Sequence, residues 1–197
     1  LMGCRGDAYT GEGCLGADAA LRLHRWQAQA LARAGLDLLF AGIMPTLPEA
    51  LGMARAMAET GLPYIISFTI CRSGTLVDGT PIDKAIACID QGTETPPVLY
   101  MANCVHPSIV YEALDQPVNR TERVAARFRG VQANTSALDY DQLDGAAELK
   151  TAEPEQLAQD MLRLKRDKGI TVLGGCCGTD GRHMEAIARA AAAWDRA

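Results

Sequence analysis

Five short apolar runs alternate with longer segments of helical periodicity, and this alternation limits the possible folds more than any other feature of the sequence. Each run is rich in Val, Ile, Leu or Phe without regular polar alternation, which is typical of strands covered on both faces. The runs cover residues 36–43, 64–70, 98–104, 129–134 and 170–173. Strands separated by helices predict right-handed βαβ units and a parallel α/β sheet, either closed into an eight-stranded (β/α)8 TIM barrel or open and doubly wound.

The length of the chain bears on the choice between these two sheets. A whole barrel takes about 250 residues and rarely fewer than 200, whereas this sequence has 197 residues. With five clear strands, a barrel would lack its first ones. We therefore expect one domain over residues 1–197, with the amino-terminal part of the barrel absent.

Helix start and stop residues mark the connections between the strands. One helix is predicted over 18–35, and the next begins at Thr46, which forms a capping box with Glu49. Further helices are predicted over 82–90, over 151–169 and after Thr179 or Asp180, while 105–127 is less regular and 136–150 is predicted to be a long polar loop.

Composition and charge exclude several classes of function. The sequence carries 19 Lys and Arg against 24 Asp and Glu, a formal net charge of −5, so a surface for nucleic acid or an anionic membrane is not expected. No apolar run approaches about 18 residues and no charged start precedes a short apolar stretch, so neither a membrane span nor a signal peptide is predicted. We expect a cytoplasmic protein with reduced cysteines.

Residues 11–16 match the dinucleotide-binding pattern G-x-G-x-x-G, and Asp37 follows about 20 residues later. The context of a nucleotide site is missing, because residues 5–10 are polar rather than a buried strand. Asp37 also begins the next strand instead of ending it. A glycine-rich loop before a helix is the better interpretation.

Three cysteines stand where predicted strands end: Cys104 is the last residue of one strand, and Cys176 and Cys177 follow another. The carboxyl ends of parallel strands meet at one rim, where α/β proteins carry their chemistry. Adjacent residues of a regular strand point to opposite faces, so Cys176 and Cys177 meet at one point only where the backbone bends, which the flanking glycines permit. Three thiolates suit tetrahedral zinc and leave its fourth position free, as in a catalytic site.

The alternative is that Cys176 and Cys177 fill small core positions and that Cys104 is an ordinary strand-end residue. Spacing alone leaves both interpretations open, because adjacent cysteines lack the spacing of a zinc ribbon.

The histidines are weaker candidates. His106 follows Cys104 closely enough to reach an ion, although a loop histidine is the simpler interpretation. His24 and His183 lie on predicted helices, and we expect both side chains to be partly exposed.

At these cysteines the sequence resembles the homocysteine S-methyltransferase family, zinc-dependent barrels that methylate a thiol to make methionine. The resemblance is carried by Asn103-Cys104 and by Gly-Gly-Cys-Cys-Gly-Thr at 174–179, followed by His183. Weaker matches occur in the family's order, so that the resemblance covers nearly the whole chain. They lie at residues 9–11, 45–50, 67–69, 78–81 and 133–135.

The resemblance implies a (β/α)8 barrel in which Cys104, Cys176 and Cys177 bind Zn²⁺. It implies a small-molecule thiol, such as homocysteine, and a methyl donor as partners, with Asn103 and Asn134 orienting substrate or ligands. S-methylmethionine, S-adenosylmethionine, betaine and a methylated folate are all used by relatives of this fold, and the sequence does not select among them. A homo-oligomer or a completing chain is left open.

Two departures from the family concern substrate recognition. The family usually places a glutamate for the substrate's amino group after the first predicted strand, where this sequence has Gly42. Neither Asp37 nor Glu49 replaces it, because Asp37 lies at the wrong strand end and Glu49 lies inside a helix. The family's opening strands, with their acidic motif, have no counterpart here.

Other functions remain open at this point. One is a non-catalytic or partner-dependent zinc-binding barrel fragment, and another is a divergent homologue acting on a different thiol. A third is a different barrel enzyme, such as a lyase, that binds phosphate at Gly174 and Gly175, but this third interpretation gives no reason for three cysteines.

Overall fold

The computed structural model describes residues 1–140, 151–194 and 196. Its centre is a five-stranded parallel sheet whose strands follow one another in chain order, β1-β2-β3-β4-β5. The strands are β1 (Leu39–Met44), β2 (Tyr64–Phe68), β3 (Leu99–Val105), β4 (Phe128–Ala133) and β5 (Val172–Gly175). Each run predicted to be a strand overlaps one of these strands. The order shows no reversal between the described strands, so the doubly wound alternative is not supported.

The sheet has a further parallel contact at its β1 edge. Met2 forms an isolated parallel bridge with Ala41. Its N–H donates to the carbonyl oxygen of Phe40 at 2.8 Å, and its own carbonyl accepts from the N–H of Gly42 at 2.8 Å. The first residues of the chain therefore lie beside β1, whereas β5 forms the opposite edge of the described sheet.

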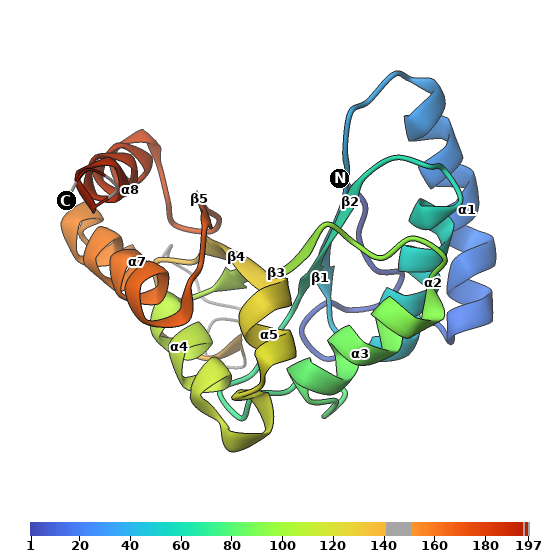
Figure 1. The fold of residues 1–197 in the computed structure, drawn as a ribbon, viewed down its shortest axis with the longest axis horizontal. Coiled ribbons are helices and arrows are strands. Elements are labelled where there is room, and N and C mark those ends of the chain that lie inside the picture. The colour runs from blue at the N-terminus through green and yellow to red at the C-terminus, as the bar shows by residue number, and fades with distance from the viewer. Residues whose placement is uncertain (141–150, 195, 197) are drawn as a thin grey trace.

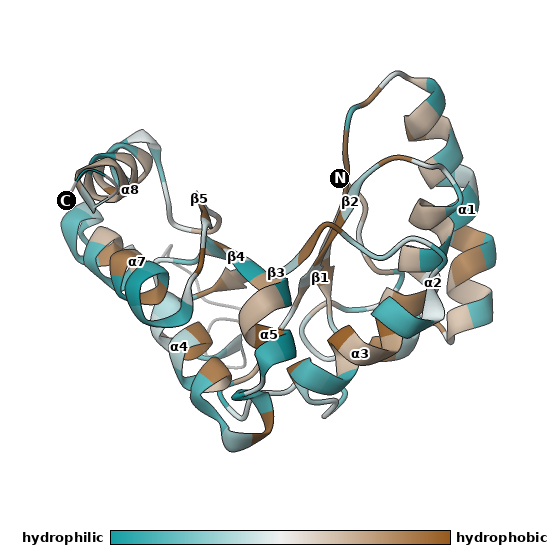
Figure 2. Cartoon of the chain, in the orientation of Figure 1, coloured by the Kyte–Doolittle hydropathy of each residue, from teal (hydrophilic) through white to brown (hydrophobic). Residues whose placement is uncertain are grey.

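Helices connect the strands and lie along the outer side of the sheet (Figure 1), with α1, α2 and α3 at the β1 end and α7 and α8 at the β5 end. They are α1 (Ala17–Arg33), α2 (Leu47–Ala58), α3 (Ile82–Gly92), α4 (Pro107–Asp115), the 3-10 turn η1 (Pro117–Asn119), α5 (Glu122–Arg127), α7 (Pro154–Lys168) and α8 (Gly181–Trp194). Figure 2 shows hydrophobic and hydrophilic bands along these helices, as expected where one face is buried.

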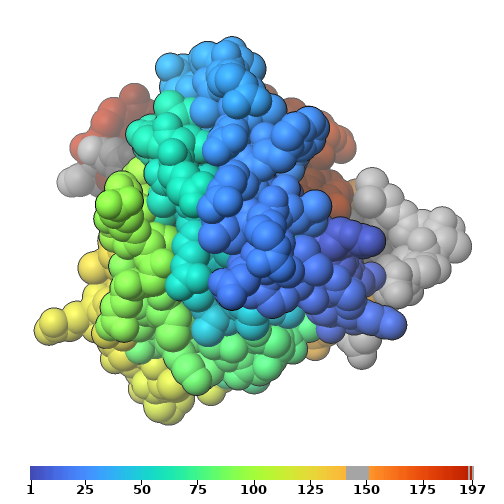
Figure 3. Space-filling view, turned by 90° about the vertical axis from the view of Figure 1, so that its right-hand side faces the viewer, coloured from blue at the N-terminus to red at the C-terminus, as the bar shows by residue number. Residues whose placement is uncertain are grey.

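The core lies between the strands and the covering helices. Phe68 and Tyr100 stack there with ring centroids 5.5 Å apart, and both are fully buried. Close packing of α1 on α2 depends on Gly52, where an added methyl group would collide with the carbonyl oxygen of Ala17. Figure 3 shows α1, α2 and α3 side by side in chain order on this outer surface. In the part of the chain that the structure describes, no helix has the length and apolarity to cross a membrane.

The predicted capping box at the start of α2 is wrong. Thr46 is the N-cap residue, but its side chain makes no capping hydrogen bond. Glu49 is fully buried and accepts hydrogen bonds from the backbone N–H groups of Arg5 at 2.5 Å and Leu15 at 2.9 Å. It also bonds to Nε2 of His24 at 2.9 Å. Glu49 therefore fixes the loop before α1 instead of its own helix end.

Other boundaries differ only slightly from the prediction. The helix expected over 151–169 begins at Pro154, and the irregular stretch 105–127 contains α4, η1 and α5. The glycine-rich stretch 11–16 is a loop before α1, as expected, with positive φ at Gly11 and Gly13. Of the predicted loop 136–150, residues 141–150 lie outside the described residues.

Candidate metal centre

Cys104 reaches the rim of the sheet through an irregularity in β3. The register between β3 and β4 shifts between Asn103 and Val105, so Cys104 is the extra residue. Its φ is 56°, in the left-handed region that side chains other than glycine enter at a cost of about 1–3 kcal/mol. Such outliers cluster at functional sites, where neighbouring structure holds them. In this chain, the unusual backbone conformation directs the nearly buried sulfur of Cys104 toward the end of β5.

Cys176 and Cys177 lie in a turn after β5. The Thr179 N–H donates to the carbonyl of Cys176 at 3.2 Å, and Gly178 at the third position has φ 78°, which is a requirement of a type II turn. The Thr179 hydroxyl donates to the same carbonyl at 2.7 Å. The backbone bend expected from the glycine-rich sequence is therefore confirmed, and Gly178 is the glycine that the turn requires.

This turn is also attached to β4. The Cys176 N–H donates to the carbonyl of Ala133 at 2.7 Å, and the Thr135 N–H donates to the carbonyl of Cys177 at 3.2 Å. Backbone bonds to a neighbouring strand thus hold the two cysteines opposite the end of β3, which pairs with β4 from the other side.

The three sulfurs converge, and all lie within 4.8 Å of one another. Sγ of Cys177 lies 4.0 Å from Sγ of Cys104 and 3.9 Å from Sγ of Cys176. In a tetrahedral site with Zn–S bonds of about 2.3 Å, ligand sulfurs are about 3.8 Å apart, so these spacings fit a metal ion. No other group of three such ligands converges among the described residues.

Sγ of Cys104 and Sγ of Cys176 lie in direct contact. Their Cα atoms are 5.4 Å apart, a separation that disulfides span. Sulfurs that lie close enough to share a metal ion are also close enough to be oxidised to a disulfide. The three-sulfur ligand set therefore requires the reduced protein.

Asn103 supports both Cys104 and the neighbouring strand. Its Nδ2 donates to Sγ of Cys104 at 3.6 Å, while its Oδ1 accepts from the Ile43 N–H at 2.9 Å and from the Ser67 hydroxyl at 2.5 Å. Ile43 is the other described non-glycine residue with positive φ, at 52°. One buried amide thus connects two strained backbone positions and donates to a candidate ligand sulfur.

The histidines have structural partners. His106 is the N-cap of α4, where Nδ1 accepts from the Ser108 N–H at 3.2 Å, and burial lowers the pKa of His106. The expectation that His24 and His183 are partly exposed is wrong, because both are buried. Nδ1 of His183 bonds to Asp180 at 2.8 Å and Nε2 to the Ala152 carbonyl at 2.9 Å, which connects the starts of α7 and α8.

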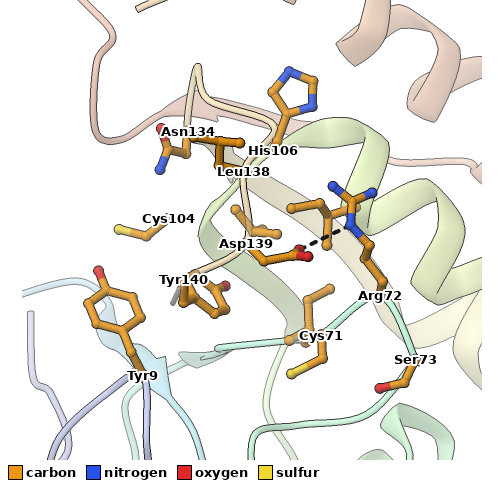
Figure 4. A pocket seen from close by; sticks show the side chains of 13 residues that line it. Tyr9, Cys71, Arg72, Ser73, Cys104, His106, Asn134, Leu138, Asp139 and Tyr140 are labelled. Carbon is orange, nitrogen blue, oxygen red and sulfur yellow. Dashed lines mark hydrogen bonds and ion pairs between the residues drawn. The ribbon is translucent and has the colours of Figure 1, made fainter. Parts of the chain in front are cut away.

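A cavity of about 380 Å³ adjoins Cys104. Figure 4 shows its wall, which contains Cys104, Asn134, Arg72 and the rings of Tyr9 and Tyr140. Asn134 is nearly buried, and its Oδ1 accepts from the Ser136 N–H at 3.0 Å. Of the residues expected to orient substrate, Asn134 lines this cavity and Asn103 lies behind Cys104.

Gly42 lies on β1 and is not among the residues that line this cavity. A Cβ there would lie 3.1 Å from the Phe40 ring and 3.2 Å from the Leu1 side chain. A larger residue would therefore have to displace one of these two side chains. The backbone N–H of its neighbour Ile43 donates a hydrogen bond to Asn103, the residue that supports Cys104. Gly42 is therefore next in sequence to a residue that contacts Asn103.

Sequence reasoning missed Tyr9, Tyr140 and Arg72 in the cavity wall. Tyr9 belongs to the weaker family match at residues 9–11, but it was given no role in the site. Arg72 and Tyr140 were visible only as residues following predicted strands. Burial, followed by the Cys177 thiolate, raises the pKa of Tyr9, which keeps its hydroxyl protonated at neutral pH.

The chain is similar to known thiol methyltransferases. The family model described as homocysteine S-methyltransferase matches residues 2–191. Homocysteine S-methyltransferase YbgG of Bacillus subtilis (strain 168) is 26% identical over 195 residues, covering 97% of this chain and 57% of that protein. Homocysteine S-methyltransferase 4 of Zea mays is 26% identical over 174 residues, covering 85% and 48%.

Solved structures show the same fold. The metallated form of the homocysteine methyltransferase MmuM from Escherichia coli matches with a TM-score of 0.70 and 24% identity, over 94% of this chain and 56% of that one. Its oxidized form matches with a TM-score of 0.67 and 25% identity, over 98% and 56%. The chain spans about half the length of the relatives it matches.

Proposed function

The chain belongs to the homocysteine S-methyltransferase family, and from this premise we propose that it transfers a methyl group to a thiol such as homocysteine at a zinc ion held by Cys104, Cys176 and Cys177. The convergence of the three sulfurs within 4.8 Å is the observation that carries the proposal. A set of three thiolates selects a soft divalent ion and leaves one position for a fourth sulfur.

The activation that such a site supplies is deprotonation of the acceptor. A free thiol has a pKa near 8.5 and is mostly protonated at neutral pH, whereas a thiol on zinc is a thiolate. No general base is then needed from the protein. This agrees with the described surroundings, where His106 and His183 are both engaged in structural hydrogen bonds.

The residues of the chain position the reacting groups. Asn103 orients Cys104, and the 380 Å³ cavity beside Cys104 holds the donor and the acceptor. The methyl carbon forms a bond to the acceptor sulfur as its bond to the donor breaks, and the bonding pair leaves with the donor. Holding carbon and sulfur in line contributes several kcal/mol to such a displacement.

We also propose that the five strands form one arc of a (β/α)8 barrel within a single domain. Sequential parallel order and helices on the outer side are the features of that barrel. Cys104 lies near the end of β3 and the Cys176–Cys177 pair follows β5, on the carboxyl rim where barrel enzymes carry their catalytic groups.

A different acceptor thiol is the second candidate, and Gly42 is the observation that favours it. Gly42 offers no carboxylate to an amino group, and Asp139 in the cavity wall is engaged by Arg72 at 3.0 Å. A thiol without an α-amino group would need neither contact.

The activity is tested by supplying reduced, zinc-loaded protein with homocysteine and a panel of methyl donors, and by detecting methionine with mass spectrometry. The proposal expects turnover that disappears in Cys104→Ser and persists in Cys88→Ser, since Cys88 lies on α3 away from the sulfur cluster. Methylation of a mercaptocarboxylic acid in place of homocysteine would establish the second candidate. Turnover retained in Cys104→Ser would refute both.

A further inference from the structure

One side chain, that of Arg72, joins three segments of the chain at the cavity beside Cys104. Arg72 follows β2 and lies in the cavity wall. Its Nε donates to Oδ1 of Asp139 at 3.0 Å, and one terminal nitrogen donates to the carbonyl oxygen of Ala137 at 2.6 Å. The other terminal nitrogen donates to Oε1 of Glu112 on α4 at 2.9 Å. Figure 4 shows the contact with Asp139 as a dashed line.

The fixed point of this arrangement is α4, the helix that carries Glu112. Its N-cap is His106, two residues after Cys104. At the other end of α4, Nε2 of the C-cap residue Gln116 donates to the backbone carbonyl of Arg72 at 3.2 Å. Both the backbone and the side chain of Arg72 are therefore bound to the helix that follows a candidate metal ligand.

The segment that Arg72 holds, residues 136–140, forms part of the cavity wall. Within this segment, the Leu138 N–H donates to the Ser136 hydroxyl at 3.3 Å. The guanidinium bonds at Ala137 and Asp139 connect the segment to the loop after β2 and, through Glu112, to α4. Three side chains of the segment line the cavity: Leu138, Asp139 and Tyr140.

Arginine is suited to this role because its planar guanidinium presents several N–H donors in a fixed fork, which a lysine ammonium lacks. The Arg72 side chain is 35% exposed, and those of Glu112 and Asp139 are 50% exposed. Ion pairs exposed to this degree contribute little to the stability of a domain. We therefore expect the contacts of Arg72 to order the cavity wall rather than to stabilise the fold.

Cys71 is a natural reporter of this order. It precedes Arg72, is partly buried and lines the cavity. Burial, followed by the Asp139 carboxylate, raises the pKa of Cys71. The carboxylate that Arg72 holds therefore acts on this sulfur, and a wall that opens would expose the sulfur to reagents in solution.

We propose that Arg72 is a positioning residue for methyl transfer, which holds residues 137–140 against α4 and so keeps the cavity wall closed around the reacting groups. This inference rests on the proposed function. The hydrogen bonds of the Arg72 guanidinium go to protein groups, so its effect reaches the reaction through the wall. A closed wall limits the entry of water and keeps donor and acceptor in line, and misalignment by about 1 Å can cost about 100-fold in rate.

The inference is tested with Arg72→Ala and Arg72→Lys in the reduced, zinc-loaded full chain. Alkylation by iodoacetamide, followed for the Cys71 peptide by mass spectrometry, should be about 10-fold faster in both variants, because a locally opened wall exposes the sulfur. The kcat/KM for thiol methylation should fall about 10- to 100-fold, while zinc content and the urea midpoint stay near wild type.

Added guanidinium ion at tens of millimolar should slow alkylation again and restore part of kcat/KM in Arg72→Ala, where the space for it is vacant, but not in Arg72→Lys. Arg120→Lys is the matched control. Arg120 forms an exposed ion pair with Asp115 at 2.8 Å and is not among the residues that line the cavity, so this variant should behave like wild type in every measurement.

Wild-type alkylation of Cys71 and wild-type kcat/KM in Arg72→Ala would overturn the inference. Faster alkylation with unchanged kcat/KM would also overturn it, since the wall would then be dispensable for methyl transfer. So would a fall in kcat/KM matched by loss of zinc or by a lower urea midpoint, which would make Arg72 a merely structural residue. Guanidinium-reversible alkylation of Cys71 in a protein that methylates no thiol would support the role of Arg72 in the wall and refute the proposed function.

Discussion

The side-chain oxygen of Asn103 accepts a hydrogen bond from the backbone N–H of Ile43 at 2.9 Å, across two strands and 60 residues of sequence. Ile43 has φ 52°, and Cys104, the residue after Asn103, has φ 56°. The same amide therefore holds the two described non-glycine residues with positive φ, one of them a candidate metal ligand. The buried side chain of Asn103, which makes these hydrogen bonds within the protein, therefore supports both strained backbone positions.

Replacing Asn103 with Ala should affect both stability and metal binding. The Ile43 N–H loses its acceptor, which costs about 1–3 kcal/mol of unfolding free energy, and the Cys104 sulfur loses its donor, which should weaken metal binding about 10-fold or more. Urea denaturation and competition with a zinc chelator measure the two effects.

Asn119→Ala is the matched control. Asn119 is also a buried amide, and it donates to the carbonyls of Gly74 at 2.7 Å and Ala113 at 2.9 Å, away from the cysteines. It should lose stability while keeping wild-type zinc affinity. Equal zinc affinities in the two variants would show that Asn103 is a purely structural residue.

Gly178→Ala tests the turn that brings Cys176 and Cys177 together. Because Gly178 has φ 78°, alanine there costs about 1–2 kcal/mol and should distort the cysteine pair, lowering zinc affinity. Gly79→Ala is the control, since Gly79 has φ 80° and open space around its Cα. A loss of zinc affinity as large in Gly79→Ala would assign the effect to general destabilisation.

Gly42→Glu tests how the acceptor is recognised. The new carboxylate supplies a partner for an amino group, so homocysteine should bind more tightly, once the Leu1 side chain, 80% exposed, moves aside. Gly42→Gln has the same size without the charge and should give no such gain. Calorimetry with homocysteine measures both, and unchanged affinity in Gly42→Glu would mean that the pocket recognises its thiol by another route.

The pH dependence of stability should reflect Glu49. Burial raises the pKa of this carboxyl, but hydrogen bonds from Leu15, His24 and Arg5 outweigh it and leave the pKa below its ordinary value. A lowered folded-state pKa stabilises the protein above the ordinary value near 4.5 and loses this contribution as pH falls toward the folded-state value. Glu49→Gln should therefore reduce stability by about 2–3 kcal/mol at pH 7 and less at pH 3.

Urea denaturation at the two pH values measures this difference. Glu59→Gln is the control, because Glu59 forms an exposed ion pair with Arg25, and exposed pairs contribute about 0–1 kcal/mol. A destabilisation by Glu49→Gln that is the same at pH 3 and pH 7 would contradict the role given to the charge.

Much of the fold was predictable because it depends on periodicity. Apolar runs and glycine stops indicated all five strands, and sequential βαβ units dictated parallel pairing. The meeting of Cys104 with Cys176 and Cys177 was predictable too, since each follows a strand and strand ends share one rim. The direct contact between the sulfurs of Cys104 and Cys176 was not, because spacing along the chain does not fix distances between side chains.

The sequence-based predictions failed for buried polar residues. Glu49 fits the pattern of a capping box, yet the N–H groups of Arg5 and Leu15 compete for its carboxylate. His24 and His183 occupy polar positions in helical patterns but are buried on partners contributed by other segments. Such partners are set by tertiary packing, which the spacing of residues along one helix does not encode.

The most direct test of the whole account is the zinc content of the purified, reduced protein, measured by elemental analysis in wild type, Cys176→Ser and Cys88→Ser. The account predicts one zinc ion per chain in wild type and in Cys88→Ser, and loss of most of it in Cys176→Ser. A full equivalent of zinc retained by Cys176→Ser, or none in the reduced wild type, would contradict it.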